Sequence, residues 1–204
     1  MAYQKFHKPK WTFVLILICI FIFILEPKIP GTLEFNPENS VNQYYSFIPT
    51  AWLERPWTFV TSIFLHGDLS HLFFNMLALF LFGIYLEPRI KTRHFFLIFF
   101  LAGILGNFAY LVFSFGSTIP AIGASGAIFG ILGTLAILFP GLIIWFGYIP
   151  MPAIFAALIW GIISFLDFFG PPTGIVNEAH LAGLFFGVLY GFYLRRKIKK
   201  VGYF

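Results

Sequence analysis

Four polar side chains occur where apolar stretches of this sequence begin. His71 and Asn75 stand four residues apart at the start of one stretch, Ser125 opens a second, and His180 opens a third. A histidine within hydrogen-bond reach of a serine can take the hydroxyl proton during attack and return it to a leaving amine. Side chains that donate hydrogen bonds nearby can stabilise an oxyanion. These residue types therefore predict nucleophilic catalysis by a Ser-His pair.

Small residues surround both candidate catalytic positions. Ser125 lies within Gly123-Ala124-Ser125-Gly126 at a helix start, where free N–H groups can hold an oxyanion. Glycines recur at three- or four-residue steps after each candidate: Gly126, Gly130 and Gly133, and Gly183, Gly187 and Gly191. Generic helix packing accounts for such glycines, but the same close packing would bring His180 within reach of Ser125.

The composition indicates that lipid is the solvent for most of this chain. Of the 204 residues, 59% are hydrophobic and only 10% are charged. Soluble domains have about 45–50% apolar and roughly 25% charged residues. We therefore expect one all-α, polytopic membrane domain. Its positive charge does not indicate nucleic acid, because the basic residues cluster at the ends of apolar stretches, as in membrane proteins.

Six apolar stretches approach the length that a membrane helix needs, about 17–25 residues. The predicted spans are Trp11–Leu25, Leu69–Leu86, Phe95–Phe115, Ser125–Phe139, Ala153–Phe168 and Ala179–Leu194. We interpret the first as a retained span, because no small-residue cleavage site follows it. The predicted organisation is a cytoplasmic N-terminus (1–10), a six-helix domain (11–194) and a basic cytoplasmic tail (195–204).

The distribution of Lys and Arg predicts the orientation of these spans. With six spans and a cytoplasmic N-terminus, all the basic residues except Lys28 and Arg55 face the inside, as the positive-inside rule requires. The expected location is the cell membrane, with both termini cytoplasmic. Spans two, four and six then run inward from the outer side. Their first turns would bring Ser125, His180, His71 and Asn75 to one shallow depth, in a polar pocket open to the outer face.

Three motifs carry a resemblance to rhomboid intramembrane proteases. They are His71-Leu72-Phe73-Phe74-Asn75, Gly123-Ala124-Ser125-Gly126 and the segment from Ala179 to Gly187, in the family's order and on the expected spans. The resemblance covers roughly residues 57–196 and implies a six-helix core. The implied reaction is cleavage of membrane-spanning proteins near the outer end of their transmembrane segment.

The resemblance also implies individual roles. Ser125 would be the nucleophile and His180 the base, while Asn75, His71 and the Ser125 N–H would line the oxyanion site. Phe129 would pack on the catalytic imidazole, and substrate would enter beside helix five, where the gate candidates are Phe155, Trp160 and Phe165. One departure concerns the first loop: the family often carries a Trp-Arg pair, but here Trp57 precedes a threonine and Arg55 comes two residues earlier.

Other polar residues have simpler interpretations. We expect His7, His66 and His94 to be interfacial, and Ser62 and Ser164 to bond to their own helix backbone. Cys19 is alone in the chain, so it offers no disulfide. Asp68 and Asp167 are expected at span ends near water, which disfavours a facing pair of catalytic acids.

Alternative functions lack the features that they would need. A zinc protease would need a motif such as His-Glu-x-x-His, which the sequence lacks, so we expect no metal and no cofactor. A channel or transporter would usually show charges within the membrane or broken helices in a repeat. The remaining alternative is an inactive rhomboid-like protein that binds membrane clients. Such relatives characteristically lack the serine or the histidine, and both are present here.

Overall fold

Helices occupy all six of the ranges predicted to be spans. The structure is a computed structural model, and it describes residues 8–171 and 174–200; His7 and the outermost parts of the two predicted ends, residues 1–7 and 201–204, lie outside these residues. The six helices are α1 (Lys10–Leu25), α4 (Leu69–Leu86), α5 (Thr92–Phe113), α6 (Ser125–Leu138), α7 (Ala153–Phe168) and α8 (Asn177–Lys200).

By length and composition, two of the described helices can cross a membrane. They are α4, continued to Arg89, and α5, while α1, α6 and α7 are shorter apolar helices. The helix positions thus agree with the predicted ranges. The number of spans stays a prediction.

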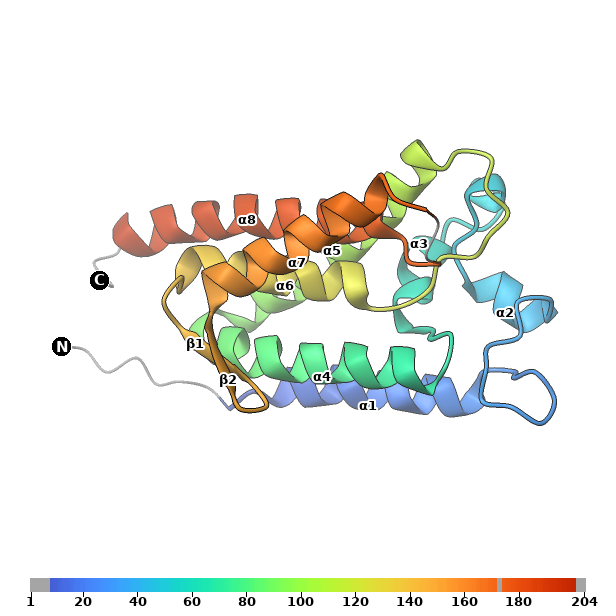
Figure 1. Cartoon of the computed structure of the whole chain (residues 1–204), viewed down its shortest axis with the longest axis horizontal. Coiled ribbons are helices and arrows are strands. Elements are labelled where there is room, and N and C mark those ends of the chain that lie inside the picture. Colours follow the sequence, from blue (N-terminus) through green and yellow to red (C-terminus); the bar gives the residue numbers. More distant parts are fainter. Residues whose placement is uncertain (1–7, 172–173, 201–204) are drawn as a thin grey trace.

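Helix α6 forms the centre of the bundle. Nearly all of its side chains are buried, and α4, α5, α7 and α8 pack around it. Helices α4, α6 and α8 run in one direction, and α1, α5 and α7 run in the other (Figure 1). The beginning of α1 and the end of α8 therefore lie at the same end of the molecule. The first residues of α4, α6 and α8 all face the opposite end.

The connections contain short elements that the sequence analysis did not predict. Between α1 and α4 lie α2 (Ser40–Tyr45), η1 (Pro49–Ala51), α3 (Thr58–Thr61) and η2 (Ser62–Phe64), and η3 (Glu87–Arg89) follows α4. Strands β1 (Ile143–Phe146) and β2 (Ile149–Pro152) form an antiparallel hairpin between α6 and α7, with Ile143 opposite Pro152. The all-α expectation was wrong at this connection. The prolines and glycines here indicate where the helices end, but they do not by themselves predict a hairpin. Gly147, with a φ of 63°, makes the turn.

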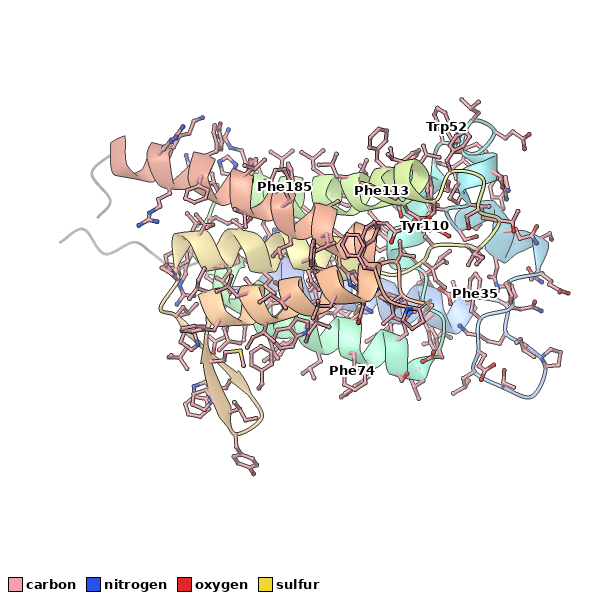
Figure 2. All side chains as sticks on the ribbon, turned by 45° about the horizontal axis from the view of Figure 1, so that its top comes forward. Phe35, Trp52, Phe74, Tyr110, Phe113 and Phe185 are labelled. Atoms are coloured by element: carbon pink, nitrogen blue, oxygen red, sulfur yellow. The ribbon has the colours of Figure 1, made fainter. Side chains whose placement is uncertain are left out.

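Large apolar side chains cover much of the outside of the bundle. Phe74 on α4, Phe113 on α5 and Phe185 on α8 are each about two-thirds exposed, and Figure 2 shows Phe74 on the opposite side of the bundle from Phe113 and Phe185. A soluble protein rarely exposes apolar patches of this extent. This surface suits a hydrocarbon environment.

Candidate active site

Ser125 and His180 meet between α6 and α8. The Nε2 atom of His180 lies 2.8 Å from the Ser125 hydroxyl oxygen, although 55 residues separate the two in sequence. Each residue lies in the first turn of its helix. This hydrogen bond has the geometry that a general base needs to activate a serine.

Contacts between glycine backbones bring the two helices together at this point. A Cβ atom on Gly183 would collide with the backbone of Gly126, and one on Gly187 would collide with the backbone of Gly130. One turn further along, Thr134 donates a 3.0 Å hydrogen bond to the Gly187 carbonyl. The small faces of α6 and α8 therefore pack directly on one another, and this packing holds the Ser-His pair.

His71 lies beside the loop that leads to Ser125. The N–H of Gly67 donates to Nδ1 of His71 over 3.2 Å. Because a backbone N–H can only donate, the proton of the neutral imidazole is on Nε2. That nitrogen faces Gly123, where a Cβ atom would lie only 2.7 Å away. Gly123 also has a φ of 115°, a conformation that side chains rarely allow. Because Gly123 has no side chain, it can adopt this backbone conformation and leaves room for the His71 ring.

Asn75 shares a cavity with the Ser-His pair. It lines a cavity of about 520 Å³ together with Ser125 and His180, between α4, α6 and α7. Its side-chain amide donates to the His71 carbonyl over 2.9 Å, and its buried oxygen has no partner in the described part of the chain. The amide has a second N–H, and the Ser125 N–H has no intrahelical acceptor because it starts α6. The Asn75 amide and the Ser125 hydroxyl thus line the same cavity.

The face and the edge of the His180 ring meet different neighbours. Phe129 stacks on the imidazole with ring centroids 4.4 Å apart and an interplanar angle of 10°. The second ring nitrogen, Nδ1, lies 3.4 Å from the hydroxyl of Ser164 on α7. The expectation that Ser164 bonds only to its own helix was wrong, because the rotation of α7 turns its hydroxyl towards α8.

A series of hydrogen bonds that the sequence analysis did not predict holds the loop at Gly123. The Gly123 N–H donates to the carbonyl of Ser62 over 2.9 Å. The Ser62 hydroxyl in turn accepts a 2.8 Å hydrogen bond from Asn107 on α5, which also donates to the Phe59 carbonyl. The expectation that Ser62 bonds to its own helix was therefore wrong, because its hydroxyl bonds to α5. Asn107 is a polar residue within an apolar stretch, which could have indicated a structural role. The neighbouring sequence does not indicate which residue it bonds to.

The three gate candidates on α7 lie in different surroundings. Trp160 lines the cavity, and its ring lies 5.0 Å from that of Phe146 in the hairpin. Phe155 and Phe165 are more than half exposed and lie outside the cavity lining. Phe146 also contacts Phe82 on α4, at 6.1 Å between ring centroids. The hairpin therefore contributes Phe146 to the cavity lining, where this ring contacts both α4 and α7.

His66 is fully buried, which corrects the expectation that it is interfacial. Its Nδ1 bonds to the Phe64 carbonyl at 3.2 Å, and its backbone N–H donates to Glu26 at 3.1 Å. Burial, together with a smaller contribution from the nearby His71, lowers the pKa of His66 to about 3. Burial also raises the pKa of Glu26, although Lys28 at 2.8 Å opposes this shift. His66 is therefore a neutral residue that supports the segment before α4.

The first loop is held by the residues that depart from the family pattern. Arg55 donates to the Gln43 carbonyl, and the Trp57 indole donates to the Tyr44 carbonyl over 2.9 Å. Both acceptors belong to α2. At the start of α4, Asp68 accepts hydrogen bonds from Ser70 and the His71 N–H, which lower the pKa of its carboxyl group. Side-chain hydrogen bonds therefore hold both the first loop and the start of α4.

Comparisons with known proteins place these features in one family. A family model described as the rhomboid domain matches residues 53–197. Rhomboid protein 1, mitochondrial, of Saccharomyces cerevisiae is 29% identical over 208 residues, which covers 98% of this chain and 57% of the yeast protein. Rhomboid protease GlpG of Klebsiella pneumoniae is 27% identical, with 94% of this chain and 68% of that protein covered. Inactive RHOMBOID-like protein 8 of Arabidopsis thaliana is 40% identical over 80 residues, which is 39% of this chain and 22% of the plant protein.

Proposed function

The chain belongs to the rhomboid family and is an integral membrane protein, and from this premise we propose that it is an intramembrane serine endopeptidase. The observation that carries the proposal is the 2.8 Å contact between Nε2 of His180 and the Ser125 hydroxyl. Curated relatives include proteases and inactive proteins, so family membership alone does not decide activity. The presence of both members of the pair favours the enzyme.

In the proposed reaction, the Ser125 hydroxyl oxygen attacks the carbonyl carbon of the scissile peptide bond. His180 takes the hydroxyl proton on Nε2 and then transfers it to the leaving nitrogen, so that an acyl-enzyme and a new amine terminus form. Water then attacks the ester by the same route and releases the acid. The oxyanion would accept hydrogen bonds from the Ser125 N–H, the Asn75 amide and Nε2 of His71. Phe129 would hold the imidazole in plane.

The proposed substrate is a single-span membrane protein. Helices α4, α6 and α8 would begin at the outer side of a six-span domain, with both termini cytoplasmic. The membrane is proposed to be the cell membrane. Because Ser125 is near the beginning of its helix, cleavage would fall near the outer end of the substrate's span. Helix-weakening Gly or Pro in the substrate should help, because the scissile bond must leave its own helix. A small residue before the cut would fit beside Gly123 and Gly126, and entry would pass α7, where Trp160 lines the cavity.

The decisive experiment compares Ser125→Ala and His180→Ala with the wild-type protein in detergent micelles. Cleavage of a single-span substrate and labelling by a fluorophosphonate probe would be measured together, with circular dichroism as a control for folding. Both variants should lose turnover, and Ser125→Ala should also lose labelling. A chelator should leave the wild-type rate unchanged. Wild-type cleavage by Ser125→Ala would refute the serine mechanism.

The same experiment distinguishes the alternative of an inactive client-binding protein. Such a protein would be folded, would neither cleave substrates nor react with the probe, and would be unaffected by Ser125→Ala. Reporter fusions at Phe204 and within residues 32–42 test the proposed topology. An external signal from Phe204 would contradict the six-span arrangement.

A further inference from the structure

The Ser164 hydroxyl is a buried polar group for which the proposed reaction does not account. Ser164 is 2% exposed and lies in the second half of α7, a helix whose other buried residues are all alanines. Its oxygen faces Nδ1 of His180 at 3.4 Å. A hydroxyl in an apolar helix costs free energy unless it finds a partner. The partner of this one is the proposed base.

We propose that Ser164 is a positioning residue that accepts a hydrogen bond from Nδ1–H of His180 and so fixes the tautomer and orientation of the base. This inference rests on the proposed function. Nε2 of His180 can take a proton from Ser125 only if, in the neutral ring, the proton is on Nδ1. In this tautomer Nδ1–H points at the Ser164 oxygen, which can accept it.

The position of Ser164 corresponds to that of an acid in a catalytic triad. In such triads the third group holds the imidazole in the correct tautomer and stabilises the imidazolium that forms. Within the described residues, the hydrogen bonds of the His180 ring go to two serines and to no carboxylate. A neutral hydroxyl can provide the orientation without a buried charge. The 3.4 Å separation is long, as is common for catalytic hydrogen bonds before substrate binds, and it should shorten when the ring becomes charged.

Phe129 and Ser164 constrain different motions of the ring. Stacking on Phe129 fixes the plane of the imidazole but does not favour either tautomer. A group that accepts a hydrogen bond at Nδ1 favours the tautomer with its proton on Nδ1. Without it, the neutral ring could place its proton on Nε2 and donate to Ser125, which would leave the serine without a base.

Two other titratable side chains face this region. His71 on α4 lies beside Gly123, and Asp167 on α7 lines the same cavity as His180. In the described part of the chain, no hydrogen bond joins either residue to the His180 ring. Glu178, which lies on α8 itself, is bound to the Ser114 hydroxyl at 2.8 Å. Ser164 is therefore the group placed to control Nδ1.

The test uses two variants with side chains of nearly equal size, Ser164→Thr and Ser164→Val, in the full-length protein. Both add a β-branched side chain, but only threonine keeps a hydroxyl. For Val we expect kcat to fall by about 10–100-fold, less than the roughly 10⁴-fold loss when a triad acid is neutralised. KM should change by less than about twofold, because an interaction that acts in the transition state alters kcat. The acidic limb of kcat/KM should move to lower pH, since the imidazolium loses an acceptor. Threonine should retain kcat and the wild-type pH profile.

Two controls keep the result interpretable. Ser164→Ala removes the hydroxyl without adding volume, and it should reproduce the loss of kcat even if α7 does not accept valine. Thermal unfolding midpoints show whether each variant is folded. Equal kcat values and pH profiles for Thr and Val, or wild-type kcat for Ala, would overturn the inference. Cleavage that persists in Ser125→Ala would instead reject the proposed function itself.

Discussion

Gly183 on α8 packs against the carbonyl of Gly126 on α6, beside the contact between Ser125 and His180. A methyl group at Gly183 would collide with rigid backbone, so the two helices would have to separate. A hydrogen bond of 2.8 Å cannot tolerate a shift of an ångström. We therefore predict that Gly183→Ala lowers turnover by at least about 100-fold, as a misplacement of this size does. Cleavage and fluorophosphonate labelling would measure the loss.

The matched control for this variant is Gly141→Ala. A Cβ atom at Gly141 would meet no atom within 4 Å. This variant should retain wild-type cleavage and a wild-type unfolding midpoint. If Gly183→Ala were equally active, direct backbone packing would not be what holds the pair.

Asn75 provides a graded test of the oxyanion site. Asn75→Ala removes one donor while His71 and the Ser125 N–H remain. A single donor contributes about 10²–10³ in rate in other enzymes, so kcat should fall by up to this factor without the complete loss expected for Ser125→Ala. KM should change little, since the oxyanion forms only during the reaction. A raised KM with an unchanged kcat would instead indicate that Asn75 binds the substrate.

Glu87 connects the end of α4 to the beginning of α1. Its carboxylate is 3% exposed and accepts hydrogen bonds from the backbone N–H groups of Trp11 and Thr12 and from the Thr12 hydroxyl, at 2.7–2.9 Å. Hydrogen bonds to a charged group contribute about 1.5–3 kcal/mol. Glu87→Gln, which keeps one acceptor oxygen and loses the charge, should lower the free energy of unfolding by about 1–3 kcal/mol.

Unfolding in mixed micelles would measure this difference. Glu54→Gln is the control, because Glu54 is exposed in the first loop. It should be as stable as the wild-type protein. Equal stabilities of the two variants would show that α1 is not held through the Glu87 carboxylate.

His66 predicts how stability depends on pH. Burial lowers its pKa from 6.5 to about 3, so the unfolded chain binds a proton as the pH falls below 6.5 while the folded chain does not. The stability contributed by the neutral ring is therefore lost progressively between these values. From pH 6.5 to pH 5 the loss is about 2 kcal/mol.

His66→Gln keeps a donor for the Phe64 carbonyl but does not titrate. Its free energy of unfolding should depend less on pH between 7 and 5 than that of the wild-type protein. Glu26 is present in both proteins, so the opposite contribution from its raised pKa should largely cancel in the comparison. Parallel pH curves for the two proteins would contradict the assignment of His66 as a buried neutral residue.

The sequence alone determined the family and the six helix positions, and it predicted the residues that we propose for the site. These features are local: an apolar stretch of given length predicts a helix, proline and glycine mark its ends, and the motifs around His71, Ser125 and His180 are each continuous in sequence. The glycine spacing even predicted which two helices pack closely. Sequence reasoning could go this far because each signal lies within a few turns of one helix.

Only the tertiary structure decided which side chains meet across helices. Ser164 and His66 looked like ordinary polar residues, yet one faces the proposed base and the other is fully buried. Of the three aromatic gate candidates on α7, only Trp160 lines the cavity. In an apolar membrane helix nearly every face is hydrophobic, so the sequence pattern does not reveal how the helix is rotated. That rotation is determined by packing against neighbouring helices, and it decides which polar group reaches which partner.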